Sequence, residues 1–532
     1  MSFNGGEFGS RFRDAILTTN KREVRECLIF YQLNPTPGVD INELFCEAVR
    51  TGSVDIIDMF LLNSRRLDLA YKDASGKRPL HHAAETGNAD IVKSIIDAGS
   101  IVNVLDGENG FSALHYAARS GKSEIVKVLV REGAHMNRNR TFKEGEAPLH
   151  MACCGGHVEV VRELIRAGAN INILTTDSHC QTPLHKAIQF RQYEIMQALL
   201  EAGADVGIPD AAGRSSLHLV AEAGPLRALK LLIEFGIAEE MPRDKRGRKP
   251  IHAAVSYRQT EIVRLLVSEI PADVDAFDND GMTPLLLAVL GGFSDIAMIL
   301  IDAGAAVDRI ELKLGATALN LAVSTGRLDI TRLLLENGAD PTIADFKGVT
   351  PLHRAQVLKS DVRGLIVKLL IMNGSRMNST DDHGYTPLDR CVFQTVLSNF
   401  DKETLKLMTS AGAHLQPIFT ESRRHRNSPL CWLVWRGDLE SARFLVNSGW
   451  NLRQETWLNL PGRNDEHTEF IAWLRRLLYE PRTLIHMCRL AIRECLSFCA
   501  NDKEILTGIG TLPLPTVIKK FLKFQEEMDM LK

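Results

Sequence analysis

The stretch that decides the fold reads TPLHKAIQFRQYEIMQALLEAGADV, residues 182–206. Thr182 is a good helix N-cap, and Pro183 suits the first helical position, where its missing N–H costs nothing. The apolar residues that follow recur at helical spacing, and the Gly-Ala pair at 203–204 closes a second helix. We therefore predict two short helices joined by a tight turn, with His185 hydrogen-bonding back toward the cap as in a capping box.

This pattern recurs along most of the chain, and a second clear copy is TALNLAVSTGRLDITRLLLENGADP, residues 317–341. A leucine-type residue marks the start of each copy at steps of 33 to 36 residues, with a final step of 42. Its positions are Phe12, Phe45, Leu80, Leu114, Leu149, Leu184, Leu217, Ile251, Leu285, Leu319, Leu352, Leu388 and Leu430. About 13 copies therefore run over residues 9–451.

The segments between copies carry the pattern D-x-x-G, as in residues 278–281 and 345–348, which predicts a hairpin turn. One such unit cannot bury its own apolar face, so the copies must stack into a continuous core. The pattern resembles the ankyrin repeat. The resemblance implies an all-α solenoid of helix–turn–helix repeats with short β-hairpin loops, which binds proteins through its hairpin tips and first-helix face. Residues 1–8, ahead of the first copy, are expected to be disordered.

Composition excludes several classes of partner. Lys plus Arg number 63 and Asp plus Glu 66, for a net charge of -3, so neither nucleic acid nor a membrane is an expected partner. The opening residues lack a secretory apolar run, and we find no membrane-spanning stretch. The ten cysteines include no C-x-x-C, which indicates reduced thiols of an intracellular protein without a metal site. We expect no cofactor and no catalytic residues.

The C-terminal part departs from the repeat. Residues 452–480 contain an amphipathic stretch that predicts a linker and capping helix. In TLIHMCRLAI, residues 483–492, an apolar stripe of helical spacing includes Leu484, Met487, Cys488 and Ile492. In TLPLPTVIKKFL, residues 511–522, two prolines fix an extended entry to a short amphipathic helix. Apolar residues beside rigid prolines suit a docking surface.

Residues 481–524 resemble a SOCS box, followed by a tail at 525–532. The resemblance makes Leu484, Met487, Cys488 and Ile492 the Elongin-binding positions. It makes a second set the cullin-binding positions: Ile509, Leu512, Pro513, Leu514, Pro515, Ile518 and Phe521. The family of ankyrin-repeat and SOCS-box proteins implies a cytoplasmic ligase subunit, with the nucleus as the alternative location. Its partners would be Elongin B, Elongin C, a cullin of the cullin-five class with its RING subunit, and an unknown protein target.

Three alternatives stay open. The C-terminal helices could be an ordinary cap on the solenoid, which every repeat array needs. The chain could be a scaffold without a role in ubiquitination. An enzyme within residues 452–480 is the weakest idea, because that stretch is too short for a catalytic core.

Other residue types have a structural and a functional interpretation. One histidine per repeat favours a hydrogen-bonding role over metal binding. The basic run at 243–249 favours a solvated turn over a nuclear signal or phosphate patch. The residue before each helix start is a candidate target contact, and hot spots are rich in aromatic residues and arginine. We select Phe111, Arg214, Arg248 and Tyr385 as target-binding residues.

Overall fold

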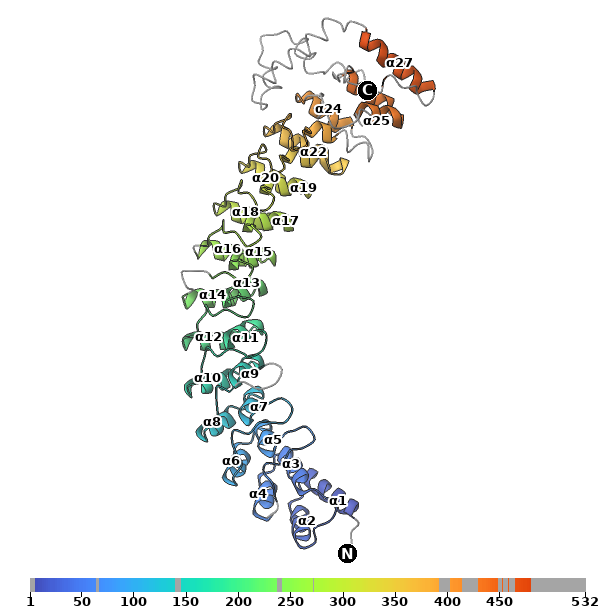
Figure 1. Ribbon diagram of the computed structural model, residues 1–532. Helices are drawn as coiled ribbons and strands as arrows, with labels where there is room; N and C mark the ends of the chain where they lie inside the picture. The colour runs from blue at the N-terminus through green and yellow to red at the C-terminus, as the bar shows by residue number, and fades with distance from the viewer. Residues whose placement is uncertain are drawn as a thin grey trace. The chain divides into compact units, whose positions relative to one another are not determined.

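The computed structural model describes residues 5–63, 67–138, 145–236, 242–270, 272–391, 402–413, 429–447, 452, 458 and 465–479. The chain divides into two compact units, Met1–Leu265 and Leu266–Lys532, and we describe each by itself. Within each unit, short helices stack in successive pairs (Figure 1). The described residues form helices and turns, with no assigned β-strand, so the all-α prediction is confirmed.

Unit 1 is built from pairs in which an odd-numbered helix is followed by an even-numbered one. The helices are α1 (Gly5–Leu17), α2 (Lys21–Leu33), α3 (Ile41–Thr51), α4 (Val54–Asn63), α5 (Pro79–Thr86), α6 (Ala89–Asp97), α7 (Ala113–Arg119), α8 (Ser123–Arg131), α9 (Pro148–Gly155), α10 (Val158–Arg166), α11 (Pro183–Gln189), α12 (Tyr193–Glu201), α13 (Ser216–Ala223), α14 (Leu226–Glu234), α15 (Pro250–Ser256) and α16 (Thr260–Ser268), whose last residues cross the unit boundary.

First helices pack on first helices and second helices on second helices, as in the α7–α9 and α8–α10 contacts. The core lies between the two rows. In α10, Val160, Val161 and Leu164 are buried, and α10 packs against α9 of its own pair and against α8 and α12. Burying one such side chain stabilises the fold by about 1.5–3 kcal/mol, so each repeat depends on its neighbours for stability.

The N-terminal end corrects one prediction. The sequence predicts that residues 1–8 are disordered, whereas residues 5–8 lie in α1, which begins at Gly5, and Phe8 is buried. The ring of Phe8 lies 5.0 Å from that of Phe30 and 5.9 Å from that of Phe12, and Phe12 stacks on Phe60 at 5.7 Å. This aromatic cluster closes the apolar end of the first pair, which is why α1 extends beyond the repeat pattern.

Unit 2 continues the same construction. Its helices are α17 (Pro284–Gly291), α18 (Ser294–Asp302), α19 (Ala318–Ser324), α20 (Leu328–Glu336), α21 (Pro351–Ala355), α22 (Ser360–Met372), α24 (Lys402–Ser410), α25 (Pro429–Arg436), α26 (Leu439–Asn447) and α27 (Asp465–Tyr479). Helices α17, α19 and α21 pack in one row, and α18, α20 and α22 pack in the other.

Helix α27 confirms the helix expected within residues 452–480. Phe470, Ile471 and Leu474 are buried. The Arg443 guanidinium, on α26, lies 5.7 Å from the ring centre of Phe470 and 5.2 Å from that of Trp473. These contacts place α27 against the last described repeat, as a capping helix requires. The domain boundaries proposed from the sequence stay predictions.

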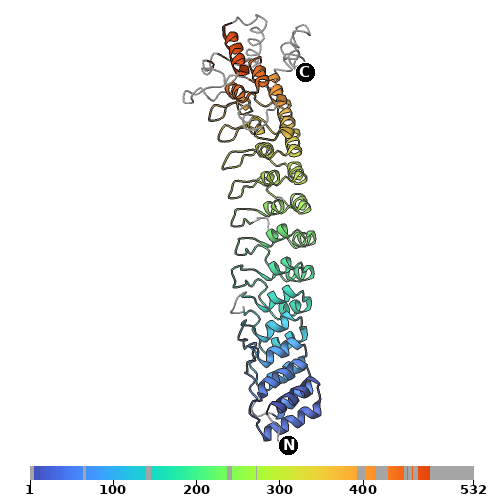
Figure 2. The ribbon, with the colours of Figure 1, turned by 90° about the vertical axis from the view of Figure 1, so that its right-hand side faces the viewer.

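The loops between pairs project from one side of each unit as narrow hairpins (Figure 2). Neighbouring hairpins are tied through their backbones. In unit 1, Lys245 N donates to Ala212 O at 3.0 Å, and in unit 2, Phe346 N donates to Leu314 O at 2.9 Å. The hairpin loops expected from the sequence are therefore present, although no β-strand is assigned to them within the described residues.

Candidate protein-interaction surface

Each well-formed hairpin is organised around one acidic side chain. In the hairpin at 210–214, one carboxylate oxygen of Asp210 accepts from Ala212 N at 2.9 Å and Arg214 N at 2.8 Å. Asp73, Asp244, Asp345 and Asp381 accept from the residues two and four positions on in the same way. The D-x-x-G pattern thus fixes a rigid loop, as short aspartate side chains do in Asx turns.

The second oxygen of these carboxylates binds a side chain. Asp244 accepts from Arg248 Nε at 3.1 Å and from its Nη2 at 3.0 Å. Burial raises the pKa of Asp244. The backbone N–H and guanidinium of Arg248 outweigh that effect and hold the pKa below its ordinary value. The carboxylate therefore stays ionised at neutral pH and holds the arginine against the loop.

The histidine at the third helical position joins one repeat to the next. His150 Nδ1 accepts from Ala147 N at 3.1 Å, and its Nε2 lies 3.0 Å from Gln181 O in the following repeat. Because Nδ1 accepts, Nε2 carries the proton and donates to that carbonyl. His218 reaches Arg248 O and His353 reaches Tyr385 O in the same way, at 2.9 and 3.0 Å. The structural interpretation of the histidines is confirmed, and the bond across repeats is a feature that sequence reasoning missed.

Burial keeps these imidazoles neutral. It lowers the pKa of His81, His150, His185 and His353 to about 4. For all but His185, the bond to a carbonyl partly opposes the shift. Within the described residues, no three His, Cys, Asp or Glu side chains gather as a metal site.

Of the four target contacts selected from the sequence, Phe111 is wrong as a surface contact. Its side chain is 3% exposed, and its ring packs 5.6 Å from that of His115 and edge-on against Tyr116 at 5.4 Å. The Tyr116 hydroxyl donates to Asp106 at 2.6 Å, and this contact helps to enclose the turn. The position of Phe111 in the repeat, just before a first helix, predicted an exposed side chain. Packing against that helix buries it instead.

The other three residues are partly exposed. Arg214 is held between two carboxylates, donating to Asp210 at 2.8 Å and to Glu222 at 2.7 Å. Arg248 has a side chain only 17% exposed because it is paired with Asp244. Tyr385 is half-buried, and its ring lies 6.5 Å from that of His383. Their role in binding a target stays a prediction.

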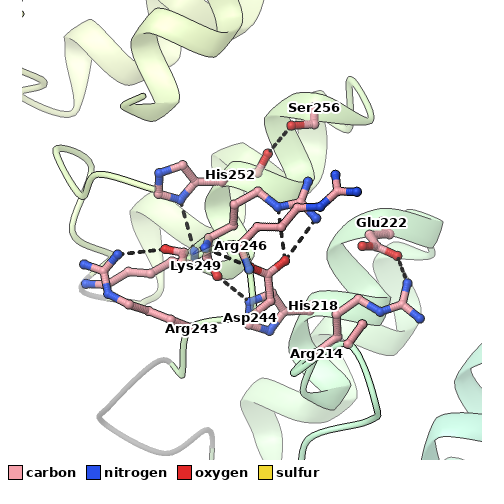
Figure 3. Close-up of polar contacts among 12 residues, drawn as sticks. Arg214, His218, Glu222, Arg243, Asp244, Arg246, Lys249, His252 and Ser256 are labelled. Atoms are coloured by element: carbon pink, nitrogen blue, oxygen red, sulfur yellow. Dashed lines mark hydrogen bonds and ion pairs between the residues drawn. The ribbon is translucent and has the colours of Figure 1, made fainter. Parts of the chain in front are cut away.

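The hairpin at 243–249, which we call the basic hairpin, presents the densest positive charge of the described hairpins. Figure 3 shows Arg243, Arg246 and Lys249 around the buried Asp244, with Arg214 and Glu222 in the preceding repeat. Arg243, Lys245 and Arg246 are exposed. The solvated turn expected from the sequence is confirmed, and it is a structured one.

Unit 2 presents a different kind of hairpin tip. Leu312, Leu314 and Phe346 are 56%, 54% and 60% exposed. Leu312 and Phe346 rest over glycines: a Cβ built on Gly281 would lie 2.5 Å from Leu312, and one on Gly315 would lie 2.5 Å from Phe346. Lys313, between the leucines, pairs with Asp280 on the neighbouring hairpin at 2.5 Å. We call Leu312, Leu314 and Phe346 the apolar tips.

The predicted docking residues of the C-terminal segment lie outside the described residues. These are Leu484, Met487, Cys488 and Ile492 for Elongin, and Ile509, Leu512, Pro513, Leu514, Pro515, Ile518 and Phe521 for the cullin. Their roles stay predictions. In the part of the chain that the structure describes, no helix is long and apolar enough to cross a bilayer.

Comparison with known proteins identifies both parts of the chain. The family model described as ankyrin repeats (3 copies) matches residues 45–140, 132–210, 203–278 and 270–345. The model described as SOCS box matches residues 480–523. The chain is 32% identical over 136 residues to ankyrin repeat and SOCS box protein 1 of Mus musculus, and 34% identical over 133 residues to the Homo sapiens protein of that name. Each alignment covers 23% of this chain, and 39% and 38% of the two relatives.

Proposed function

Because this chain belongs to the ankyrin-repeat family and carries a SOCS-box match at residues 480–523, we propose that it is the substrate-recognition subunit of a SOCS-box ubiquitin ligase. The repeats would hold a target protein. The C-terminal segment would dock on Elongin C, with Elongin B, and on a cullin of the cullin-five class with its RING subunit. The match at residues 480–523 is the observation that carries this proposal.

The chain itself would do no chemistry. A substrate receptor accelerates ubiquitin transfer by holding the target beside the charged E2, which converts a bimolecular encounter into an effectively unimolecular one. A stack of rigid hairpins suits this role, because a preorganised surface loses little conformational entropy on binding. Such a subunit is expected in the cytoplasm, with the nucleus as an alternative.

The test is co-purification of the full-length chain with Elongin C. Leu484→Arg combined with Cys488→Arg places two charges on the predicted apolar stripe and should abolish capture. His486→Arg is the matched control, since it adds a charge on the opposite side of the same predicted helix and should leave capture intact. Undiminished capture by the double variant would refute the proposed docking stripe.

A non-catalytic scaffold without a role in ubiquitination is the second candidate, favoured by the extent of the repeat array alone. Changing Leu512, Pro513, Leu514 and Pro515 to alanine separates the two. A ligase subunit should then fail to recruit the cullin but still bind Elongin C, and the half-life of its target should increase. A scaffold would show the same target half-life before and after the change.

A further inference from the structure

The basic hairpin concentrates charge in a chain that is nearly neutral overall. Residues 243–249 read RDKRGRK, which is five cationic side chains against one carboxylate, or a net charge of +4. The preceding hairpin, residues 210–214, has one aspartate and one arginine. This local excess stands against a net charge of -3 for all 532 residues.

The loop that carries these charges is rigid. Asp244 accepts from Arg246 N at 2.8 Å and from Arg248 N at 2.9 Å, and Gly247 N donates back to Asp244 O at 2.8 Å. Lys245 N donates to Ala212 O at 3.0 Å, which anchors the loop to the preceding repeat. The cationic side chains therefore start from a fixed backbone, which lowers the entropic cost of binding a partner.

The carboxylates of this hairpin and of the preceding repeat hold two of the arginines. Asp244 is buried and paired with Arg248, while Asp210 and Glu222 hold Arg214 at 2.8 and 2.7 Å. Arg214 and Arg248 therefore brace the loops. Of the other cationic side chains, Arg243, Lys245 and Arg246 are exposed and Lys249 is half-buried. Arg243 Nη1 also donates to Gly247 O at 2.7 Å.

We propose that the basic hairpin is the docking point for an acidic segment of the target, an extended run of aspartate and glutamate residues. This inference rests on the proposed function and deepens it, because it names the chemistry of the target. Carboxylates match guanidinium groups in geometry as well as charge, and opposite charges speed association. The surface is confined to one hairpin beside the carboxylates of the preceding one, whereas a nucleic-acid site needs a longer basic stripe.

The experiment measures binding of a fluorescein-labelled peptide, four repeats of Glu-Asp-Gly, to the full-length chain by fluorescence anisotropy. The test variant carries Arg243→Ser, Lys245→Ser and Arg246→Ser. The control carries Arg131→Ser, Arg162→Ser and Arg166→Ser, which removes the same charge from exposed positions on α8 and α10. Circular dichroism checks that both variants are folded.

We expect the test variant to weaken peptide binding about tenfold or more and the control less than about twofold. Raising the salt from about 50 to about 300 mM should weaken binding to the unmodified chain, because these charges are exposed to solvent. Equal affinity of the two variants overturns the proposal. So does a single-stranded RNA of 12 nucleotides that binds more tightly than the peptide and is lost in the same test variant.

Capture of Elongin C by the same proteins separates the two proposals. If Elongin C is captured but the peptide does not bind, the acidic-target inference fails and the proposed function stands. If the peptide binds as expected but Elongin C is not captured, the hairpin is an acidic-peptide site and the ligase role fails.

Discussion

The two units place different residues at the third position of their first helices. Unit 1 carries histidine there in six successive repeats, at His81, His115, His150, His185, His218 and His252, whereas unit 2 carries Leu286, Asn320, His353 and Asp389. The helices nevertheless start in the same way. Thr283 accepts from Leu286 N at 3.3 Å and Thr317 accepts from Asn320 N at 3.2 Å. The histidine is therefore not required for the cap itself.

What the histidine adds is a bond to the next repeat and a titratable group. Asn320 reproduces the bond, since its Nδ2 donates to Ile343 O at 3.1 Å. Asp389 accepts from Thr386 N and Thr386 Oγ1, both at 2.8 Å, but an ionised carboxylate has no proton to donate onward. Unit 1 should therefore be the more sensitive of the two to acid.

The largest expected effect is acid destabilisation of unit 1. Its His81, His150 and His185 have a pKa of about 4 when folded and about 6.5 when unfolded. The stability that depends on their neutral form is complete above pH 6.5 and is lost as the pH falls toward 4, by up to about 3 kcal/mol for each residue. Hydrogen exchange at pH 7 and pH 5, corrected for intrinsic rates, should show the greater loss of protection in unit 1. Equal losses in the two units would contradict this prediction.

The second effect separates the cap from the bond across repeats. His150→Leu removes partners from both Ala147 N and Gln181 O, and should lower the free energy of unfolding by about 2–4 kcal/mol. His185→Leu is the matched control. Its Nδ1 accepts from Thr182 N, and its Nε2 has no partner among the described residues, so we expect a loss of about 1–2 kcal/mol. Urea unfolding measures both, and equal losses would show that the bond to the next repeat contributes nothing.

The third effect has the opposite pH dependence. Burial raises the pKa of Asp389 to about 6, above its ordinary 3.8, so the folded chain favours the protonated carboxyl. The stabilising contribution of this group is present below pH 3.8 and is lost as the pH rises through 6. Asp389→Asn should therefore stabilise the chain at pH 7.5 by about 1–2 kcal/mol, and by little at pH 4. Thermal unfolding at the two pH values tests this, with the exposed Asp382→Asn as a control that should change little at either pH.

The smallest effect concerns the apolar tips. Leu312→Ser combined with Phe346→Ser alters side chains that are more than half exposed, so the free energy of unfolding should change by about 0.5 kcal/mol or less. Fluorescence of an apolar dye bound to the chain should fall, however, because an exposed apolar surface is removed. Met372→Ser changes an exposed residue at the end of α22 and is the control. A large loss of stability in the double variant would show that the tips pack more than their exposure indicates.

The repeat fold was predictable because it depends on local rules. Threonine, proline and glycine fix where helices begin and end, and a step of about 34 residues fixes the stack. What sequence reasoning missed depends on contacts between neighbours. Phe111 is buried because its ring packs against His115 and Tyr116. Arg248 pairs with Asp244, so the exposed cationic side chains of the basic hairpin are Arg243, Lys245 and Arg246 instead.

The N-terminal error has a similar cause. Residues 5–8 carry no repeat signature, but the apolar end of the first pair needs a cover, and Phe8 supplies it. Repeat periodicity predicts the interior of an array but not the residues that cover its ends. In the C-terminal segment, helical spacing marked the apolar stripe that includes Leu484 and Cys488, whereas family resemblance supplied the docking roles, and these roles stay predictions.

The bond that links successive repeats ends on the main chain, at the carbonyl of Gln181, Arg248 or Tyr385. Any amino acid supplies that carbonyl, so the link does not depend on the side chain at these positions, although that of Gln181 is buried and that of Arg248 pairs with Asp244. Evolution could therefore retarget such a receptor by exchanging residues along its hairpins while its backbone connections persist. For protein engineering, position 385, where the tyrosine is half-buried, is therefore the natural place to randomise a library for new binding specificities.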